Sequence, residues 1–149
     1  MKNFRLRRTS LMSAEDIFNI SVDVANFHQV LPKYFQSLKI IQDNKHEKIV
    51  LEKISFLGFS AMVKTKHVIL PPNLHHVYIL SGPLKGSFFL ESYNPLKIGT
   101  EIIIDVHLKF FGFFSGFNFL NVYIANKMHQ IMNEFITSVE TKINKKTND

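Results

Sequence analysis

The clearest alternation of apolar and polar residues lies between Thr100 and Phe110. Apolar side chains occupy every second position, at Ile102, Ile104, Val106, Leu108 and Phe110. Polar side chains fill the positions between them, at Glu101, Asp105, His107 and Lys109, with Ile103 as the exception. Successive side chains of a strand point to opposite faces. The pattern therefore predicts a strand of an antiparallel sheet with one buried and one wet face.

A different periodicity marks the C-terminal part of the chain. Apolar residues recur there at spacings of three or four, at Leu120, Ile124, Met128, Ile131, Phe135 and Val139. This spacing forms one continuous stripe on a helix. Asn118 is a suitable N-cap for that helix, and we expect the polar residues 147–149 to fray.

Shorter patterns fill the first hundred residues. Residues 3–12 indicate a strand, and Ser13 followed by two acidic residues is typical of a helix start. A second short helix is expected at residues 24–30, where Pro32 ends it. From residue 38 onward, β-rich runs alternate with turn-like groups. The predicted order is one strand, two short helices, about six strands and one long helix.

This order favours an α+β fold with two layers. Short connections between successive strands indicate an antiparallel sheet with one apolar face, and the long helix has one apolar stripe. The simplest packing lays the helix across the sheet. A gap between two such layers is a common place for a ligand.

Composition narrows the possible functions. The chain has 149 residues, the size of one domain, and a net charge of +6 that includes clusters at both ends. Cysteine is absent, which excludes disulfides, thiolate metal sites and cysteine nucleophiles. We expect no signal peptide, because residues 1–12 are basic and contain no apolar core. We expect no spanning helix, because the longest apolar stretch, residues 110–125, is shorter than the roughly 18–20 residues that a bilayer requires.

Phenylalanine is concentrated between Lys109 and Leu120, in the segment KFFGFFSGFNFL. Gly112 and Gly116 interrupt this segment, so an ordinary core helix is not expected there. Two interpretations stay open. The rings either cover the mouth of a ligand cavity, with the glycines as hinges, or they complete the core.

The sequence shows no recognised catalytic or metal-binding motif. His75 and His76 are adjacent on an expected strand, so they point to opposite faces, while His67 can neighbour one of them across the turn at Pro71. Histidines without a carboxylate or cysteine at a fixed spacing are a poor metal signal. Catalysis in a cavity would need a polar group there, for which the candidates are His67, Tyr78, Glu52 and Tyr93. Glu91, Asp105 and Glu101 are interpreted as isolated carboxylates, and no catalytic residue is assigned.

Three stretches resemble the START-like helix-grip superfamily, which includes polyketide cyclases, plant lipid-binding allergens and lipid-transfer domains. They are residues 13–32, which resemble a helix pair ending in Leu-Pro, residues 81–92, which resemble a Gly-Pro hairpin strand, and the Gly99-Thr100 pair. Within the superfamily the chain is most similar to the coenzyme Q-binding group. Lys33 departs from that group, in which an aromatic residue usually follows Leu-Pro, and this chain has no Trp.

The resemblance implies a single domain over residues 1–146, in which a curved antiparallel sheet of about seven strands grips the C-terminal helix. It also implies a cavity between sheet and helix, with residues 111–117 beside its mouth. The expected ligand-binding residues are Phe88, Leu90, Ile104, Val106, Leu108, Phe110, Phe113, Phe114, Phe117, Leu120, Ile124 and Met128.

We therefore expect a protein that binds a hydrophobic small molecule (lipid, isoprenoid or quinone) as carrier, chaperone or sensor, without catalysis, cofactor or metal. Its expected place is the cytoplasm, with transient contact to anionic membrane surfaces through its basic residues. One alternative is a polyketide cyclase or dehydrase on the same fold. A second is an interaction protein of RNA or the ribosome, although no RNA-binding signature accompanies the charge.

Overall fold

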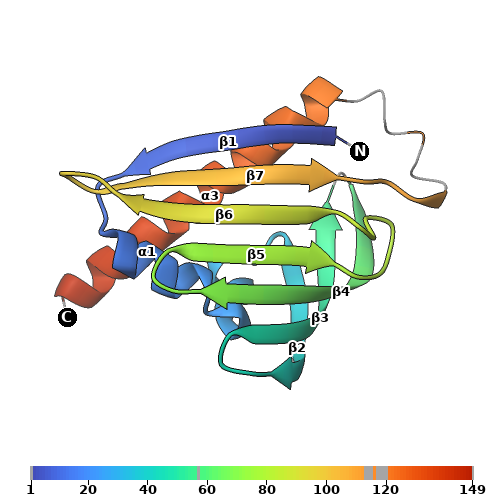
Figure 1. Ribbon diagram of the computed structural model, residues 1–149, viewed down its shortest axis with the longest axis horizontal. Coiled ribbons are helices and arrows are strands. Elements are labelled where there is room, and N and C mark those ends of the chain that lie inside the picture. The colour runs from blue at the N-terminus through green and yellow to red at the C-terminus, as the bar shows by residue number, and fades with distance from the viewer. Residues whose placement is uncertain (1, 57, 113–115, 117–120, 149) are drawn as a thin grey trace.

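The computed structural model describes residues 2–56, 58–112, 116 and 121–148. Its elements follow the predicted order (Figure 1). They are β1 (Lys2–Ser10), α1 (Ala14–Ser21), η1 (Val24–Asn26), α2 (Phe27–Val30), β2 (Phe35–Asp43), β3 (Glu47–Phe56), β4 (Phe59–Leu70), β5 (Leu74–Ile79), β6 (Phe88–Pro95), β7 (Thr100–Leu108) and α3 (Asn121–Asn148). The predicted α+β class is confirmed.

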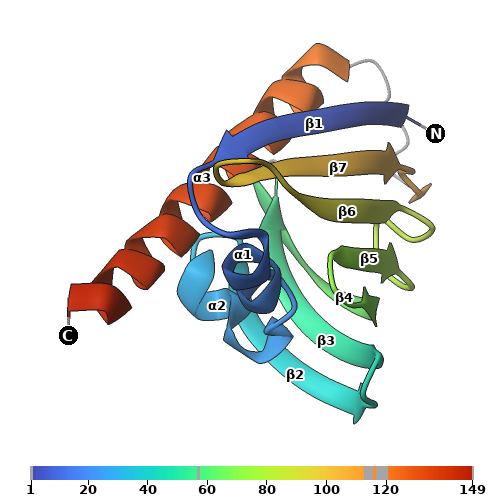
Figure 2. The same ribbon diagram turned by 60° about the vertical axis from the view of Figure 1, so that its left-hand side comes forward.

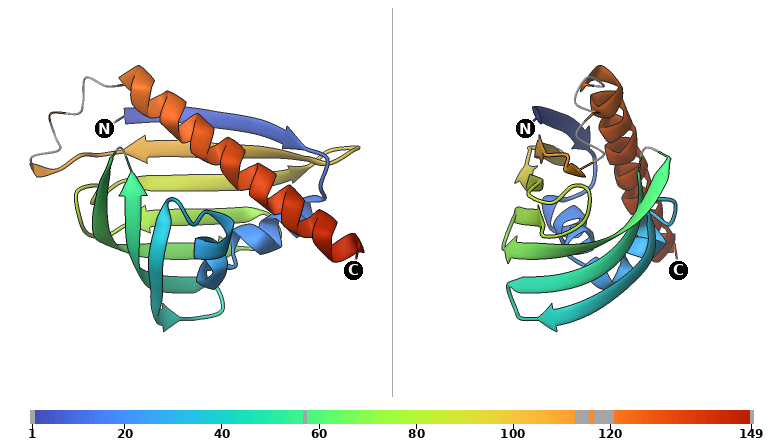
Figure 3. Two further views of the ribbon diagram at one scale, coloured as in Figure 1. Left: turned by 180° about the vertical axis from the view of Figure 1, so that it is seen from behind. Right: turned by 90° about the vertical axis from the view of Figure 1, so that its right-hand side faces the viewer.

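The seven strands of the described residues form one antiparallel sheet in the order β1-β7-β6-β5-β4-β3-β2. Each strand from β2 to β6 pairs with the next one along the chain. The first strand, β1, pairs with the last one, β7, from Lys2 opposite Leu108 to Ser10 opposite Thr100. The sheet is strongly curved, and the long helix α3 lies on its concave side (Figure 3). This arrangement is the predicted grip of a sheet on one helix.

Helix α1 begins where the sequence predicts it. The Ser13 side chain caps the helix by accepting a hydrogen bond from the Asp16 backbone N–H at 3.2 Å, and Ile17 and Phe18 turn inward to the core. The predicted second helix is divided between η1 and α2. All three short helices lie on the same side of the sheet as α3 (Figure 2).

Helix α3 buries a stripe that differs in part from the predicted one. Ile124 and Val139 are fully buried, as are Met132 and Ile136, which the predicted stripe did not include. Met128, Ile131 and Phe135 are only partly buried, and Leu120 lies outside the described residues. Within the described part of the chain, no helix has the length and hydropathy needed to span a membrane.

Gly99 lies in the turn between β6 and β7, close to the end of β1. Its φ is 81°, and a Cβ added there would lie 1.9 Å from the Ser10 carbonyl oxygen. Glycine is therefore needed for both conformation and space. The close approach lets the Thr100 hydroxyl donate a hydrogen bond to the Met12 carbonyl at 2.7 Å, which ties the end of β1 to the start of β7.

Candidate functional site

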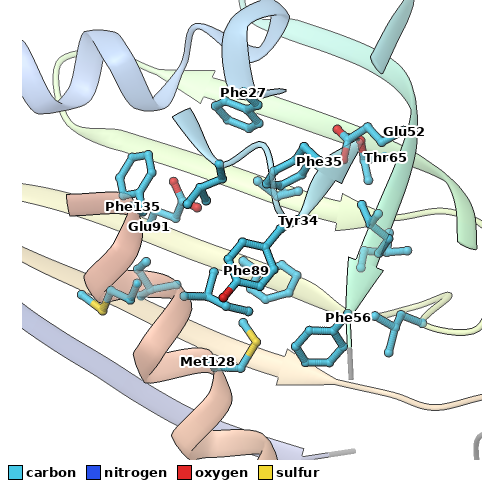
Figure 4. Close-up of a pocket in the computed structure, with 18 of the residues that line it drawn as sticks. Phe27, Tyr34, Phe35, Glu52, Phe56, Thr65, Phe89, Glu91, Met128 and Phe135 are labelled. Carbon is cyan, nitrogen blue, oxygen red and sulfur yellow. Dashed lines mark hydrogen bonds between the residues drawn. The ribbon is translucent and has the colours of Figure 1, made fainter. Parts of the chain in front are cut away.

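A cavity of about 210 Å³ lies between the concave face of the sheet and α3. Its wall is mainly apolar and draws on nearly every element of the fold (Figure 4). The apolar and aromatic lining residues are Leu6, Phe27, Leu31, Tyr34, Phe35, Ile54, Phe56, Val63, Val77, Ile79, Leu84, Phe89, Tyr93, Ile104, Leu108, Met128, Ile131, Met132 and Phe135. Met128, Ile131 and Phe135, the partly buried residues of the predicted stripe, face this space together with the buried Met132.

Strand alternation decides which side chains reach the cavity. On β6 the inward residues are Phe89, Glu91 and Tyr93, and on β4 they are Val63, Thr65 and His67. On β3 the inward residues at every second position are Glu52, Ile54 and Phe56. Each of these three strands therefore sends at least one ionisable or hydroxyl side chain into a mainly apolar wall.

Three of the polar side chains form a buried group on β3 and β4. The Thr65 hydroxyl donates to Glu52 Oε1 at 2.8 Å, and His67 Nε2 lies 3.1 Å from the same oxygen. His67 Nε2 also lies 3.1 Å from the Thr65 hydroxyl. All three residues are at least 97% buried, with exposed fractions of 2% for Glu52, 3% for Thr65 and 1% for His67.

His75 extends this group to the next strands. His67 Nδ1 lies 3.0 Å from His75 Nε2, and His75 Nδ1 lies 2.9 Å from Glu91 Oε2. The Tyr93 hydroxyl donates to the same Glu91 oxygen at 2.9 Å. The result is a continuous chain of contacts from Glu52 to Tyr93, which we call the polar network (Glu52, Thr65, His67, His75, Glu91 and Tyr93).

An aromatic ring from α2 covers the middle of the polar network. Phe27 meets the His67 and His75 rings at steep angles, with centroids 5.9 and 6.5 Å away. The planes of the two imidazoles lie within 20° of each other with centroids 5.2 Å apart, and the 3.0 Å contact between their nitrogens places the rings edge to edge. Figure 4 shows Phe27 above the cavity, Glu52 and Thr65 on one side, Glu91 on the other, and Phe56 with Met128 at the opposite end. The polar network therefore lies at one end of the cavity, away from Phe56 and Met128.

Burial and neighbouring charges shift the pKa values in this network. Burial lowers the pKa of His67 below the usual 6.5, and the charge of His75 acts in the same direction against the opposing effect of Glu52. For Glu91, burial alone would raise the pKa, but His75 and the Tyr93 hydroxyl outweigh it and lower the pKa below 4.5. Burial, together with the Glu91 carboxylate, raises the pKa of Tyr93. Perturbed groups beside a cavity are typical of functional sites.

Tyr34 contributes a second kind of polar group to the wall. Its hydroxyl is buried and makes no hydrogen bond of acceptable geometry with the described residues. Burial and the nearby Glu134 carboxylate raise the pKa of Tyr34 to about 12. The phenol therefore stays protonated near neutral pH.

The structure separates the expected ligand-binding residues into four groups. Ile104, Leu108 and Met128 line the cavity. Val106, Phe110 and Ile124 are buried in the surrounding core, and do not contribute to the lining. Phe88 and Leu90 do not line it either; Phe88 stacks on His107 at 4.2 Å, on the outer face of the sheet. Phe113, Phe114, Phe117 and Leu120 lie outside the described residues.

The sequence of β6 does not show which of its faces points inward. Phe88, Phe89 and Leu90 are consecutive and apolar, so both faces carry apolar side chains. The pairing with β7 settles the orientation, because Phe89 is opposite Val106 and Glu91 is opposite Ile104, both on the inner face of β7.

Three of the four polar candidates, His67, Glu52 and Tyr93, do line the cavity, whereas Tyr78 packs beside Phe88 and His76. The neighbour of His67 is His75. The interpretation of Glu91, Asp105 and Glu101 as isolated carboxylates is wrong, because Glu91 contacts His75, Asp105 pairs with Arg5, and Glu101 pairs with Arg7. Among the described residues, no three or more His, Asp or Glu side chains are placed to hold a metal ion.

Cross-strand register explains why these contacts were missed. His75 is directly opposite Glu91 in the pairing of β5 with β6. His67 and His75 are diagonal neighbours, because His67 is opposite Val77. Glu52 and Thr65 are also diagonal, because Glu52 is opposite Val63. The residues that meet across two strands depend on the length of the turn that joins them. A search for fixed residue spacings along the chain therefore does not find such contacts.

No protein-family model and no curated protein matches the sequence. Solved structures do match the fold. The Zhui aromatase/cyclase from Streptomyces sp. R1128 superposes with a TM-score of 0.79 at 10% identity, over 98% of this chain and 95% of that one. A START superfamily protein from Mycobacterium smegmatis gives 0.74 at 15% identity, over 93% and 97%. Ara h 8.0201 gives 0.72 at 16% identity, over 97% and 98%. At these identities the likeness establishes the helix-grip fold.

Proposed function

We propose that this protein binds a hydrophobic small molecule in the cavity between the sheet and α3, as a carrier, chaperone or sensor. The observation that carries the proposal is the cavity of about 210 Å³ with a mainly apolar wall between the sheet and α3. An apolar ligand that covers this wall removes apolar surface from water at about 25 cal/mol per Å². Because it would bind the folded state and not the unfolded chain, such an occupant would stabilise the fold.

The comparisons and the sequence support the chemical class of the ligand. Proteins of this fold include the Zhui aromatase/cyclase and a START superfamily protein. The resemblance to the coenzyme Q-binding group adds quinones to lipids and isoprenoids as candidate ligands. A carrier of this kind would work in the cytoplasm and contact anionic membranes transiently through its net charge of +6.

The test is native mass spectrometry of gently purified protein, followed by solvent extraction and identification of the released molecule. Ile104→Phe supplies a variant that fills the cavity, and Ile103→Phe is its matched control, because Ile103 lies on the opposite face of β7. We expect a stoichiometric apolar adduct on the wild type and on Ile103→Phe, and little adduct on Ile104→Phe. A clean ligand-free mass after incubation with lipid extracts and quinones would contradict the proposal.

A second candidate function is a cyclase or dehydrase acting on a polyketide-like substrate. The polar network favours it, because Glu52, Glu91 and His67 all lie at the cavity wall, where they can exchange protons with a bound carbonyl compound. Incubation with a linear poly-β-ketone analogue tests this function. Formation of a cyclised product lighter by one water, abolished in His67→Asn, is the expected result for an enzyme, and unchanged substrate is the expected result for a carrier.

A further inference from the structure

The hydrogen-bond geometry of the polar network fixes how many protons it holds. Three contacts run in series, from Glu52 Oε1 to His67, from His67 to His75 at 3.0 Å, and from His75 to Glu91 Oε2. Each contact needs one proton between its two atoms. Two neutral imidazoles carry one N–H each and can supply only two of the three. One additional proton is therefore shared by the four groups.

The additional proton belongs to the histidine pair. Glu91 Oε2 accepts from the Tyr93 hydroxyl as well as facing His75, and Glu52 Oε1 accepts from the Thr65 hydroxyl as well as facing His67. An oxygen that receives two donors is suited to an ionised carboxylate. With both carboxylates ionised and one extra proton on the imidazoles, the network carries a net charge of −1.

Each carboxylate uses only one of its oxygens in these contacts. Among the described residues, none donates a hydrogen bond to Glu91 Oε1 or to Glu52 Oε2. Glu91 keeps 17% of its side chain exposed and lines the cavity, whereas Glu52 keeps 3%. The acceptor that Glu91 presents to the cavity is thus the more accessible of the two.

A ligand that fills the cavity must displace water from Glu91. An apolar molecule without a donor then leaves a carboxylate oxygen buried and unpaired, which is unfavourable, whereas a hydroxyl group restores the lost hydrogen bond. We propose that the ligand of this cavity carries a hydroxyl or phenol group that donates a hydrogen bond to Glu91, with its apolar body toward Phe56 and Met128. This inference rests on the proposed binding function and narrows its ligand class.

Two kinds of common head group are poor partners for the Glu91 carboxylate. A quinone carbonyl and an ether oxygen can only accept hydrogen bonds, so they cannot pair with the Glu91 oxygen. A fatty-acid carboxylate adds like charge to a site whose net charge is already −1. At Glu91 the site therefore favours alcohols and phenols, including the reduced form of a quinone, over quinones and fatty acids. The Tyr34 hydroxyl, which is unpaired among the described residues, can donate to an acceptor elsewhere on the same ligand.

Isothermal titration calorimetry at neutral pH with three bicyclic probes tests the inference. The probes are 2-naphthol, which donates a hydrogen bond, 2-methoxynaphthalene, which only accepts one, and 2-naphthoate, which is anionic. We expect 2-naphthol to bind about tenfold to a hundredfold more tightly than 2-methoxynaphthalene, the range for a hydrogen bond to a charged group. Binding of 2-naphthoate should be the weakest.

The variant Glu91→Gln sharpens the test. The amide oxygen can accept from Tyr93 and His75, which leaves the NH₂ group, a donor, toward the cavity. The preference for 2-naphthol over 2-methoxynaphthalene should then disappear or reverse. Comparing this ratio between variant and wild type cancels the different sizes of the two probes. Glu101→Gln, on the outer face of β7 beside Arg7, is the matched control and should keep the wild-type ratio.

The outcomes separate the two proposals. Equal binding of the three probes to the wild type, or tighter binding of 2-methoxynaphthalene or 2-naphthoate, overturns this inference alone. Binding of none of them overturns the proposed function and this inference with it. An unchanged ratio in a folded Glu91→Gln variant overturns the assignment to Glu91. If circular dichroism shows that this variant does not fold, the order of the three probe affinities on the wild-type protein alone decides whether the inference holds.

Discussion

The two faces of the sheet pair acids with bases across neighbouring strands in opposite environments. On the outer face Arg5 holds Asp105 through two contacts of 2.6 and 2.9 Å, and Arg7 lies 3.3 Å from Glu101. The arginine side chains keep 59% and 61% of their surface exposed. On the concave face His67 meets Glu52 with side-chain exposures of 2% and 3%. Similar distances therefore join groups with very different access to water.

This difference decides what each pair does. Exposed pairs remain solvated in the unfolded chain and in the fold, so they contribute little net stability. A buried charge depends on its partners, because it has given up its hydration. The outer pairs neutralise part of the cationic character of β1, which weakens the case for an RNA-binding face. The inner network supplies the polar end of the cavity.

The largest contrast is expected from removing a histidine on each face. His75→Ala leaves Glu91 and His67 without the ring that joins them, and should lower the free energy of unfolding by about 3–5 kcal/mol. Urea denaturation followed by circular dichroism measures it. His107→Ala is the control, because His107 lies on the outer face and contacts Asn3 and Phe88. Equal losses in the two variants would contradict the distinction between the faces.

Threonine offers a second, smaller contrast. Thr65→Val keeps the shape of the side chain and removes the hydroxyl that donates to the buried Glu52 carboxylate. The expected loss is about 1–3 kcal/mol, since a buried acceptor is left with fewer donors. Thr9→Val changes the same atoms on an exposed position of β1 and should stay within about 0.5 kcal/mol. Thermal unfolding of the two variants side by side gives the answer.

Much of the fold could be predicted because its signals are local. The alternation along β7 and the Ser13 cap of α1 are carried by neighbouring residues, and the structure confirms both. The apolar stripe predicted for α3 was incomplete. Met132 and Ile136 are buried beside the predicted residues, because α3 packs against strands on one flank and the cavity on another. A stripe drawn along one line does not capture so broad a buried surface.

The candidate site was less predictable because its contacts are made across strands. The sequence identifies His67, Glu52 and Tyr93 as polar groups that a cavity could contain, but not the contacts that join them. Glu91 was interpreted as isolated, although its partner His75 lies 16 residues away and directly opposite. Recognising that pair from sequence requires the register of β5 and β6, which the turn between them determines.

Acid pH should affect the concave face more than the outer face. The folded-state pKa of His67 lies below 6.5 and that of Glu91 below 4.5, so the unfolded chain binds more protons as the pH falls through each value. Stability therefore decreases as the pH falls below about 6.5. Hydrogen bonding to Arg5 also lowers the pKa of Asp105, but water screens that exposed pair.

Urea titrations between about pH 3 and pH 8 measure this dependence. Glu91→Gln should flatten the acid part of the profile, because one of the depressed carboxyl pKa values is removed. Asp105→Asn should leave the profile close to that of the wild type. A profile flattened by Asp105→Asn and unaffected by Glu91→Gln would place the acid sensitivity on the outer face instead.

The smallest effect is expected from the outer pair itself. Arg7→Gln removes the guanidinium that lies 3.3 Å from Glu101 and should lower the free energy of unfolding by less than about 1 kcal/mol. In about 1 M NaCl, where the Debye length is about 3 Å, even this difference between variant and wild type should vanish. The His75→Ala difference should persist at the same salt concentration, because ions do not enter the buried network. A salt-insensitive loss at Arg7 would show that the side chain acts by packing its methylene groups on the sheet, and the outer face would then contribute to the fold as more than a solvated surface.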